Sequence, residues 1–443
     1  AEAGSGHAGS INIHTEGLLS VLNGGVIRSR TLTQGNAGEV TIETGELLVN
    51  RQDSVFFTGI ISDAASDSYG HAGSVTITSD GSLSVLNGGM IRSSTFSAGS
   101  GQAGQVNIVA NEVRVDGQYS NDATGISSSA QAGSGNAGSV NVNSDGLVSV
   151  LNGGTITSDT FTSGDAGEIN IEAGEVQVNR QGSNIVTGIF SSAEPNSQGN
   201  AGAVSINTEG LLSILNGGII RSSTFSTGHA GLVNIAADDV LVNGFFSRIS
   251  SSSHFFNSGN VGSVSVTAQN NVTLLNNASI QISSESISAD PGSATLNELN
   301  ITSPNITLSD HSEISAASTG NIAASDIVLN SHNLSLSGES LITTEASQGN
   351  GGTITLNTDN VLLLQNSQIT TSVNGLVGNG GDINIMTPVL VMQTGFIQAN
   401  TKAAHASGGD INLAIDALIP SSNTLLQGDN APLPFLPGVA GYN

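Results

Sequence analysis

A block that recurs every 64 or 65 residues constrains the fold of this chain more than any other feature of its sequence. Its most regular part, Gly-Leu-Leu-Ser-Val-Leu-Asn-Gly-Gly at residues 17–25, returns with small changes at 81–89, 146–154 and 210–218. Each block holds two copies of a shorter motif, x-Ala-Gly-x-(Val/Ile)-x-(Ile/Val), which are 29 to 35 residues apart. Such self-similarity is typical of solenoids, in which each repeat packs only on its neighbours.

The repeat divides the chain into three parts. Residues 1–261 carry regular double repeats, and residues 262–413 carry divergent single repeats such as Asn-Gly-Gly-Asp-Ile-Asn-Ile at 379–385. Together these copies predict 14 rungs. Residues 414–443 leave the pattern in an apolar, proline-rich segment, with Pro-Leu-Pro-Phe-Leu-Pro at 432–437. We expect this last part to be a capping or docking tail.

Within one copy, three short runs alternate apolar and polar residues, at 10–14, 19–21 and 26–30. A period of two indicates strands, and Gly, Asn and Ser clusters separate the runs. No segment has the 3.6-residue period and the caps of a helix. Near-identical copies can all have equivalent neighbours if the chain coils, so that each strand pairs with its counterpart one turn later. The sequence therefore predicts an all-β fold, a right-handed parallel β-helix with three faces.

The same pattern predicts which residues form the core and the turns. Glycines and asparagines are expected at corners that require positive φ. Phenylalanines share one repeat position, and we expect them to fill one corner of the core: Phe96, Phe161 and Phe225, with Leu32 in the first copy. The residues of the first copy expected to point inward are Ile11, Ile13, Leu19, Val21 and Ile27.

Composition excludes several classes of function. The chain has 35 acidic and 9 basic residues and a net charge of −26, with Lys402 as its single lysine. Nucleic-acid binding requires clustered Lys and Arg, so no nucleic-acid partner is expected. No apolar run approaches the 18 residues of a membrane span. Because cysteine is absent, disulfides, thiolate metal sites and cysteine nucleophiles are excluded.

Repeated histidines and carboxylates are the candidate metal ligands. His7, His71 and His229 precede the Ala-Gly motif in three copies, but the coil would hold them two and five rungs apart. Zinc ligands must lie about 2 Å from one ion, so we interpret this as a polar corner position. We expect no cofactor and no metal site, except that adventitious Ca²⁺ could bridge carboxylates that share one position. These are Glu39, Glu168, Asp382 and Asp410.

Some parallel β-helices cleave pectin, so catalytic residues must be sought. Asn357-Thr358-Asp359 resembles an element of polygalacturonases, but Asp238-Asp239 lies upstream of it and no Gly-His-Gly follows. Lys402 has no arginine two residues before it. Glycoside hydrolysis also needs two carboxylates at a defined separation. The close pairs Glu43/Glu46 and Glu172/Glu175 recur with the repeat, which is typical of a solvated face. We therefore predict no catalytic residues and no enzymatic activity.

Rows of hydroxyl residues suggest a further surface. They comprise Ser29, Ser93, Ser158 and Ser222, and Thr31, Thr95, Thr160 and Thr224. Such rows can bind ice or glycan, but tryptophan is absent and Arg28, Arg92 and Arg221 interrupt the array. We expect these rows to form a solvated face.

The repeats Gly-Asn-Gly-Gly-Asp-Ile-Asn-Ile and Leu-x-Val-Leu-Asn-Gly-Gly-x-Ile-x-Ser resemble those of filamentous haemagglutinin-like exoproteins of the two-partner secretion type, found in cyanobacteria and other Gram-negative bacteria. The resemblance covers about residues 7–413. It implies secretion through an outer-membrane transporter, an extracellular or cell-surface location, and a role in adhesion, aggregation or fibres. The family's amino-terminal secretion domain does not occur in this sequence.

We therefore expect a structural protein of the cell exterior. A nearly standard rung begins by His7 without a separate capping segment, so we expect the rod to assemble head to tail with copies of itself. The alternative is an adhesin rod that binds glycan or a cell surface. Its binding elements would be the variable loops at residues 51–57, 117–123 and 180–186.

Overall fold

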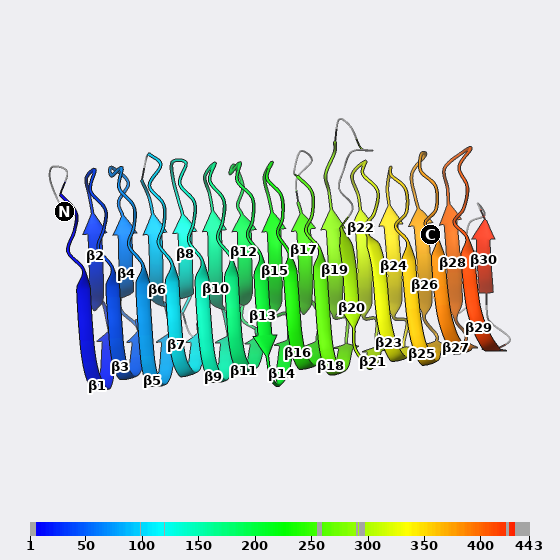
Figure 1. Cartoon of the computed structure of the whole chain (residues 1–443), viewed down its shortest axis with the longest axis horizontal. Coiled ribbons are helices and arrows are strands. Elements are labelled where there is room, and N and C mark those ends of the chain that lie inside the picture. Colours follow the sequence, from blue (N-terminus) through cyan, green and yellow to red (C-terminus); the bar gives the residue numbers. More distant parts are fainter. Residues whose placement is uncertain are drawn as a thin grey trace.

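The chain forms a right-handed coil of parallel strands, as Figure 1 shows. It descends along one sheet in front, returns upward through a second sheet behind, and advances with each turn from the N-terminal to the C-terminal end. This computed structural model describes residues 6–97, 99–118, 120–254, 259–288, 291 and 297–421, and the backbone of 425–429. Fourteen rungs stack in sequence order. The predicted parallel β-helix is confirmed.

Sheet A is built from the longer strands, which follow the motif x-Ala-Gly-x-(Val/Ile) in each repeat. Every neighbouring pair is parallel and in register, so like residues lie over like residues. Its strands are β1 (Ile11–Leu22), β3 (Val40–Asn50), β5 (Val75–Leu86), β7 (Val106–Asp116), β9 (Val140–Leu151), β11 (Ile169–Asn179), β13 (Val204–Thr208), β14 (Leu211–Leu215), β16 (Val233–Asn243), β18 (Val264–Leu275), β20 (Glu298–Thr302), β21 (Asn305–Leu308), β23 (Asp326–Leu336), β25 (Ile354–Gln365), β27 (Ile383–Gln393) and β29 (Ile411–Pro420).

Sheet B contains the shorter strands, one from each rung. They are β2 (Val26–Thr31), β4 (Thr58–Ala64), β6 (Gly89–Thr95), β8 (Thr124–Ala130), β10 (Gly154–Thr160), β12 (Gly188–Ala193), β15 (Ile219–Thr224), β17 (Arg248–Ser253), β19 (Ser279–Ser284), β22 (Glu313–Ser318), β24 (Leu341–Ala346), β26 (Gln368–Val373), β28 (Phe396–Thr401) and β30 (Leu425–Asp429).

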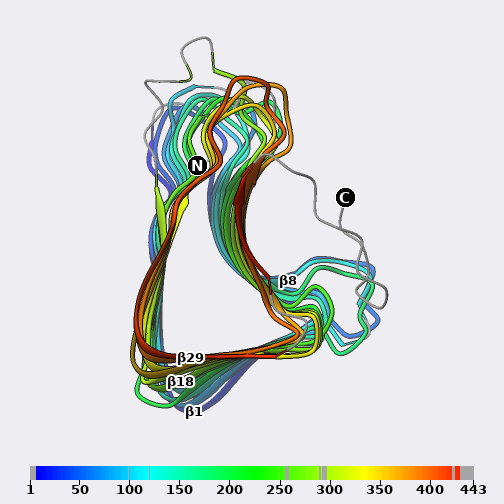
Figure 2. The same ribbon diagram turned by 90° about the vertical axis from the view of Figure 1, so that its right-hand side faces the viewer.

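The cross-section has three sides, because the long strands of sheet A bend around a corner (Figure 2). The register shifts at this bend, between Thr15 and Leu18 in the first rung, so one copy of each double repeat has an extra residue there. The first two predicted runs therefore merge into one bent strand. They remain separate strands only in β13/β14 and β20/β21.

Stacked aliphatic side chains fill the interior. One inward position of sheet B is isoleucine in thirteen successive rungs, from Ile27 to Ile397. Burial of each such side chain contributes about 1.5–3 kcal/mol. The five residues predicted to point inward in the first copy do so. Four of them are only partly buried, whereas their counterparts Val40 and Ile42 in the second rung are fully buried, because the described residues place no rung below the first.

The predicted positive-φ turns lie between sheets A and B. Asn23, Asn87, Asn152 and Asn216 have φ between 50° and 53°, and the glycine after each has φ between 84° and 90°. Asparagine tolerates this left-handed region and glycine enters it without steric cost, which explains why Asn-Gly returns at the same place in each double repeat.

Two expectations require correction. Phe161 is 41% exposed and Leu32 is 37% exposed, so the shared phenylalanine position faces outward rather than filling a core corner. The coil also continues beyond residue 414, the expected start of the tail, because β29 pairs with β27 and β30 pairs with β28. The proline-rich residues 432–437 lie outside the described residues.

Candidate ligand-binding face

The predicted solvated rows of serine and threonine are in fact buried inside the coil. All eight of these side chains are at most 3% exposed. Ser158 shows why: its Oγ donates a hydrogen bond to Gly138 O (3.0 Å) and accepts one from Gly167 N (2.8 Å), the equivalent glycine one turn later. The same bridge occurs at the serine of every rung from Ser29 to Ser251. We call this row the serine–glycine ladder.

The glycines of the repeated motif pack too closely to carry a side chain. A Cβ on Gly138 would lie 2.3 Å from Gly104 O, and the other motif glycines from Gly38 to Gly262 are equally crowded. Where the regular repeats end, Ile282 and Ala316 replace the ladder serine. The divergent sequence after residue 262 thus corresponds to the end of this ladder.

The repeated histidines belong to another backbone-supporting row. Nδ1 of His7, His71 and His229 accepts a hydrogen bond from the backbone N–H of the residue one rung later, at 2.8 to 3.0 Å. Asn36, Asn136 and Asp165 accept the same bond through their side-chain oxygens. His, Asn and Asp can replace one another at this position because each presents an acceptor to the backbone N–H of the next rung.

The carboxylates that share one repeat position follow one another along the rod axis. Glu39 and Glu168 are separated by three intervening rungs, so they lie about 19 Å apart. Asp382 and Asp410 are adjacent, and the Asp382 carboxylate accepts a hydrogen bond from Asp410 N (2.8 Å). The described residues contain no group of three or more His, Asp or Glu side chains that can hold a metal ion.

The residues considered for catalysis also lie apart. Asn357 and Thr358 bond to their equivalents in neighbouring rungs, Asn330 and Thr387, and thereby support the coil. Asp239 accepts a hydrogen bond from Asn271 in the next rung (2.6 Å). Asp239 and Asp359 are four rungs apart, which is about 19 Å along the axis. The close pairs Glu43/Glu46 and Glu172/Glu175 are exposed. The coil thus separates Asp239 from Asp359.

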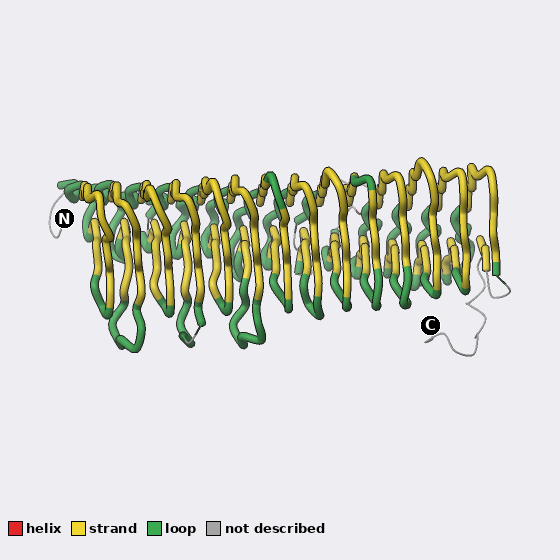
Figure 3. The backbone as a smooth tube through the Cα atoms, turned by 90° about the horizontal axis from the view of Figure 1, so that it is seen from below, coloured by secondary structure: helices red, strands yellow, loops and turns green. Residues whose placement is uncertain are grey.

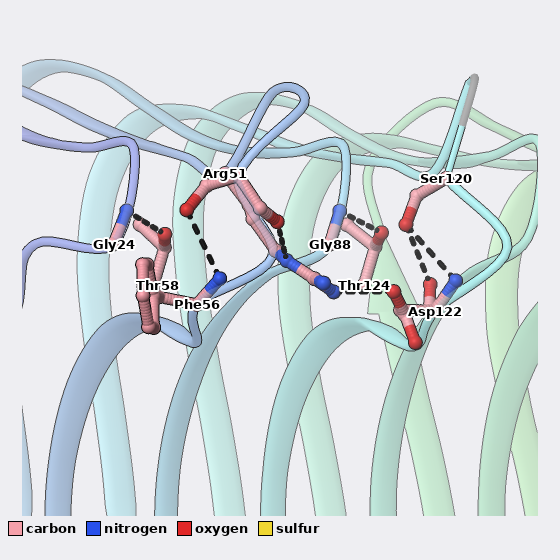
Figure 4. A network of polar contacts seen from close by, with 9 residues as sticks. Gly24, Arg51, Phe56, Thr58, Gly88, Ser120, Asp122 and Thr124 are labelled. Atoms are coloured by element: carbon pink, nitrogen blue, oxygen red, sulfur yellow. Dashed lines mark hydrogen bonds and ion pairs between the residues drawn. The ribbon is translucent and has the colours of Figure 1, made fainter.

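The three variable loops project from one edge of the rod in every second rung, as Figure 3 shows. At their bases, Oγ1 of Thr58, Thr124 and Thr187 accepts a hydrogen bond from the Asn-Gly turn of the preceding rung, at 2.6 to 2.7 Å. Arg51 Nε donates to Ser54 O (2.7 Å) within its own loop. Arg51 Nη1 also contacts Asp122 Oδ2 (2.5 Å), which joins loop 51–57 to loop 117–123 (Figure 4).

The first and third of these loops carry exposed apolar side chains. Val55 is 82% exposed and Phe56 is 71% exposed, and Val186 occupies the third loop with 45% exposure. A shorter turn two rungs later adds Phe245 and Phe246. The first and third loops thus combine a hydrogen-bonded base with exposed apolar side chains.

The outer face of sheet B lies between these loops and those at the opposite end of the sheet (Figure 2). It carries five of the nine basic residues of the chain, and we call it the arginine face: Arg28, Arg30, Arg92, Arg221 and Arg248. In the sequence, three of these arginines stand out only as interruptions of a hydroxyl row. One sequence pattern could have identified two of them: an arginine four residues before a phenylalanine, which occurs in both Arg92/Phe96 and Arg221/Phe225.

Two arginines of this face are each held between aromatic rings. The Arg92 guanidinium lies 5.0 Å from the centre of the Phe57 ring and 5.7 Å from that of Phe96. Arg221 lies in the same way between Phe190 (4.7 Å) and Phe225 (5.3 Å). Cation–π contacts of this kind fix the position of a cation and stabilise it by about 0.5–2 kcal/mol. We call the two arrangements the first and second arginine clamps.

The two clamps differ in the carboxylates that act on their arginines. Burial lowers the pKa of Arg221, whereas Glu194 and Asp159 oppose this shift through their negative charge. Burial likewise raises the pKa of Glu194, and it raises the pKa of Asp159 to about 7, with a further contribution from Glu194. The second clamp therefore contains its own acidic groups. At the first clamp, burial also lowers the pKa of Arg92, and Asp63 opposes the shift.

The raised pKa of Asp159 predicts that the rod loses stability as the pH rises from about 4 to 7. In this range the folded state retains a proton on Asp159 that the unfolded state has released, so unfolding becomes more favourable with increasing pH. Asp159→Asn removes this pH-dependent loss of stability. We therefore expect the variant to have a higher urea midpoint than the unaltered chain at pH 8, but not at pH 4. Equal midpoints for the two proteins at both pH values would contradict the assignment.

No helix among the described residues is long and apolar enough to cross a membrane. Comparisons with known protein families, with curated proteins and with solved structures find no match to this chain. Its fold is therefore established by its own structure, as a parallel β-helix with two arginine clamps on the outer face of one sheet.

Proposed function

We propose that this chain is a non-enzymatic, extracellular structural protein, a β-helical rod that assembles head to tail into filaments. The observation that carries the proposal is the state of the two end rungs. Among the described residues, strands β1 and β2 pair only with β3 and β4, and β29 and β30 pair only with β27 and β28. The outer edges of these four strands therefore have no strand partner in this part of the chain, and an unpaired edge is a template for another strand.

Apolar side chains are also less buried in the first and last described rungs. Ile11 and Ile13 in the first rung, and Ile411, Leu413 and Ile415 in the last, are only partly buried. Because every interior rung pairs in parallel with the same register, the last rung of one copy can receive the first rung of another. A contact of this kind does not close on itself, so it propagates into a filament.

Three further elements of the proposal rest on other grounds. The extracellular location and the outer-membrane transporter follow from the resemblance to haemagglutinin-like exoproteins. The absence of enzymatic activity is supported by the separation of the acids considered for catalysis. The net charge of −26 opposes association of copies, so assembly should depend on ionic strength.

Electron microscopy and sedimentation test this proposal directly. We expect filaments at about 0.15 M salt and micromolar protein, and single rods at about 0.01 M salt, where the Debye length grows from about 8 Å to about 30 Å. The filament width should equal that of one rod. If only single rods occur at every protein and salt concentration, the proposal is wrong.

The row of braced loops favours a second candidate function, that of an adhesin rod that binds a glycan or a cell surface. Loops 51–57, 117–123 and 180–186 recur every second rung, about 10 Å apart, and the first and third expose apolar side chains. A regular comb of this kind can contact one extended ligand at several points. Filament assembly and ligand binding use different surfaces, so the two functions are compatible.

A further inference from the structure

The first arginine clamp contains a cation that no carboxylate of the described residues contacts directly. Arg28 binds Asp63 through two hydrogen bonds, one of them between Nε and Oδ1 at 2.8 Å. Asp63 is 1% exposed and also pairs with Arg30, so its charge is already shared by two arginines. Arg92, one strand further along, makes no ion pair or hydrogen bond with any described residue, and its buried Nε lacks an acceptor.

Arg92 is one of three arginines on this face, with Arg221 and Arg248, whose buried Nε lacks an acceptor among the described residues. The chain has 35 acidic residues and 9 basic ones, so a carboxylate for each arginine is readily supplied. Buried charges are normally paired, because the loss of hydration must be offset. The Arg221 guanidinium of the second clamp also has an Nε without an acceptor among the described residues, but two acids, Glu194 and Asp159, oppose the lowering of its pKa. At the first clamp, which has the same aromatic geometry, the opposing acid is Asp63, and Arg28 and Arg30 already share its charge.

The clamp is also prepared for an oxyanion. The Phe57 and Phe96 rings hold the Arg92 guanidinium in place, so little side-chain freedom remains to be lost on binding. Arginine presents parallel N–H donors that match the oxygens of a carboxylate or sulfate. The Arg28 side chain, 34% exposed, lies on the same face and can add a donor.

The surroundings favour a sugar as the carrier of this oxyanion. Phe56, 71% exposed, and Tyr69, 63% exposed, lie in the loops that precede and follow β4, so aromatic surfaces border both ends of this strand. Sugar rings combine apolar C–H faces with hydroxyls and pack on such rings. A nucleic acid, with one charge per about 1.7 Å, would meet few cations here and a net charge of −26.

We propose that the outer face of the first three rungs binds an acidic glycan, and that Arg92, with Arg28 beside it, holds the carboxylate or sulfate of one sugar. This inference rests on the second candidate function, because a binding face is what an adhesin requires. It adds the chemical class of the ligand and the residues that select it.

The experiment measures binding of three fluorescent probes to the full chain: a galacturonate trimer, a sulfated galactose trimer and a neutral galactose trimer. The variants are Arg92→Thr and, as a matched control, Arg221→Thr. Threonine occurs at this position in the fifth rung, as Thr157, so the coil accepts the substitution. Phe96→Leu loosens the clamp but keeps the charge, and leucine occupies the equivalent position as Leu32.

We expect at least one acidic probe to bind more tightly than the neutral probe. Arg92→Thr should weaken that binding about tenfold or more, Phe96→Leu about threefold, and Arg221→Thr less than twofold. Preference for galacturonate or for the sulfated trimer identifies the oxyanion. Equal binding of acidic and neutral probes, or equal effects of Arg92→Thr and Arg221→Thr, would overturn the inference.

An additional variant distinguishes failure of this inference from failure of the adhesin function on which it rests. This variant has a shortened loop 180–186, which lies remote from the first clamp. If the neutral probe binds and only loop shortening abolishes its binding, the adhesin function stands and the acidic-glycan site is wrong. If a polyglutamate peptide binds through Arg92 and no sugar does, the ligand class is wrong. Absence of binding for all probes contradicts both proposals.

Discussion

Replacement of Gly138 by alanine should lower the free energy of unfolding by about 3–5 kcal/mol, the largest effect that we expect from a single added methyl group. The new Cβ would lie 2.3 Å from Gly104 O and 2.6 Å from Gly104 C. Both atoms belong to the backbone of the adjacent rung, which strand pairing on either side holds in place. Neither can move without breaking the register of sheet A.

The same substitution should change the shape of the unfolding curve. A solenoid is stabilised by contacts between neighbouring repeats, so a defect at one junction uncouples the rungs on its two sides. We expect urea unfolding, followed by circular dichroism, to separate into two transitions, where the unaltered chain shows one. A single transition with an unchanged midpoint would show that the close glycine contact has no energetic role.

Gly9 provides the matched control. It occupies the same motif position in the first described rung, and a Cβ added to it would have no atom of the described residues within 4 Å. We expect Gly9→Ala to change the stability of the single rod by less than about 0.5 kcal/mol. A comparable loss of stability in both variants would attribute the effect to the conformational preference of glycine itself instead of the rung contact.

Gly9→Ala should nevertheless abolish filament assembly, the second large effect. The glycine row runs to Gly409 in the last rung, and each glycine in it from Gly38 onward approaches the carbonyl oxygen of the equivalent residue one rung earlier. If copies stack head to tail in register, Gly9 of one copy meets Gly409 O of the preceding copy at about the same distance. An alanine there would create between copies the clash that Gly138→Ala creates within one.

Sedimentation and microscopy of Gly9→Ala check this prediction. We expect single rods under conditions in which the unaltered chain forms filaments. Substitution of the exposed Asn12 by alanine, on the same strand but on its outer face, should leave assembly unchanged. Filaments of Gly9→Ala would show that copies do not continue the rung register, and would exclude the head-to-tail geometry proposed above.

The interior could be predicted from the sequence because its signal is local and repeated. Alternation in residues 10–14 and 26–30 specifies strands, and a copy every 29 to 35 residues specifies their stacking. The Asn-Gly turns were predictable for the same reason, since φ near 50° at Asn23 depends on its own backbone. The order of these runs along one repeat was enough to predict that each rung has three faces.

The candidate site was not predictable in the same way. Arg92 and Phe57 are 35 residues apart and come from adjacent rungs, so their contact depends on the register of β4 and β6. Arg51 and Asp122 are 71 residues apart and join loops two rungs apart. The presence or absence of a carboxylate beside each clamp likewise depends on which side chains the coil brings together.

The sequence by itself determined the period, the strands, the stacking and the inward aliphatic rows, because these follow from residue spacing along one repeat. Only the tertiary structure decided the role of the polar rows. Ser158 shares a strand face with Ile156, yet a hydroxyl is stable in that interior only because Gly138 O and Gly167 N, one turn of the coil apart, both approach it. Hydrogen-bond partners for a buried polar group come from other segments of the coil, and their distance is set by packing rather than by sequence.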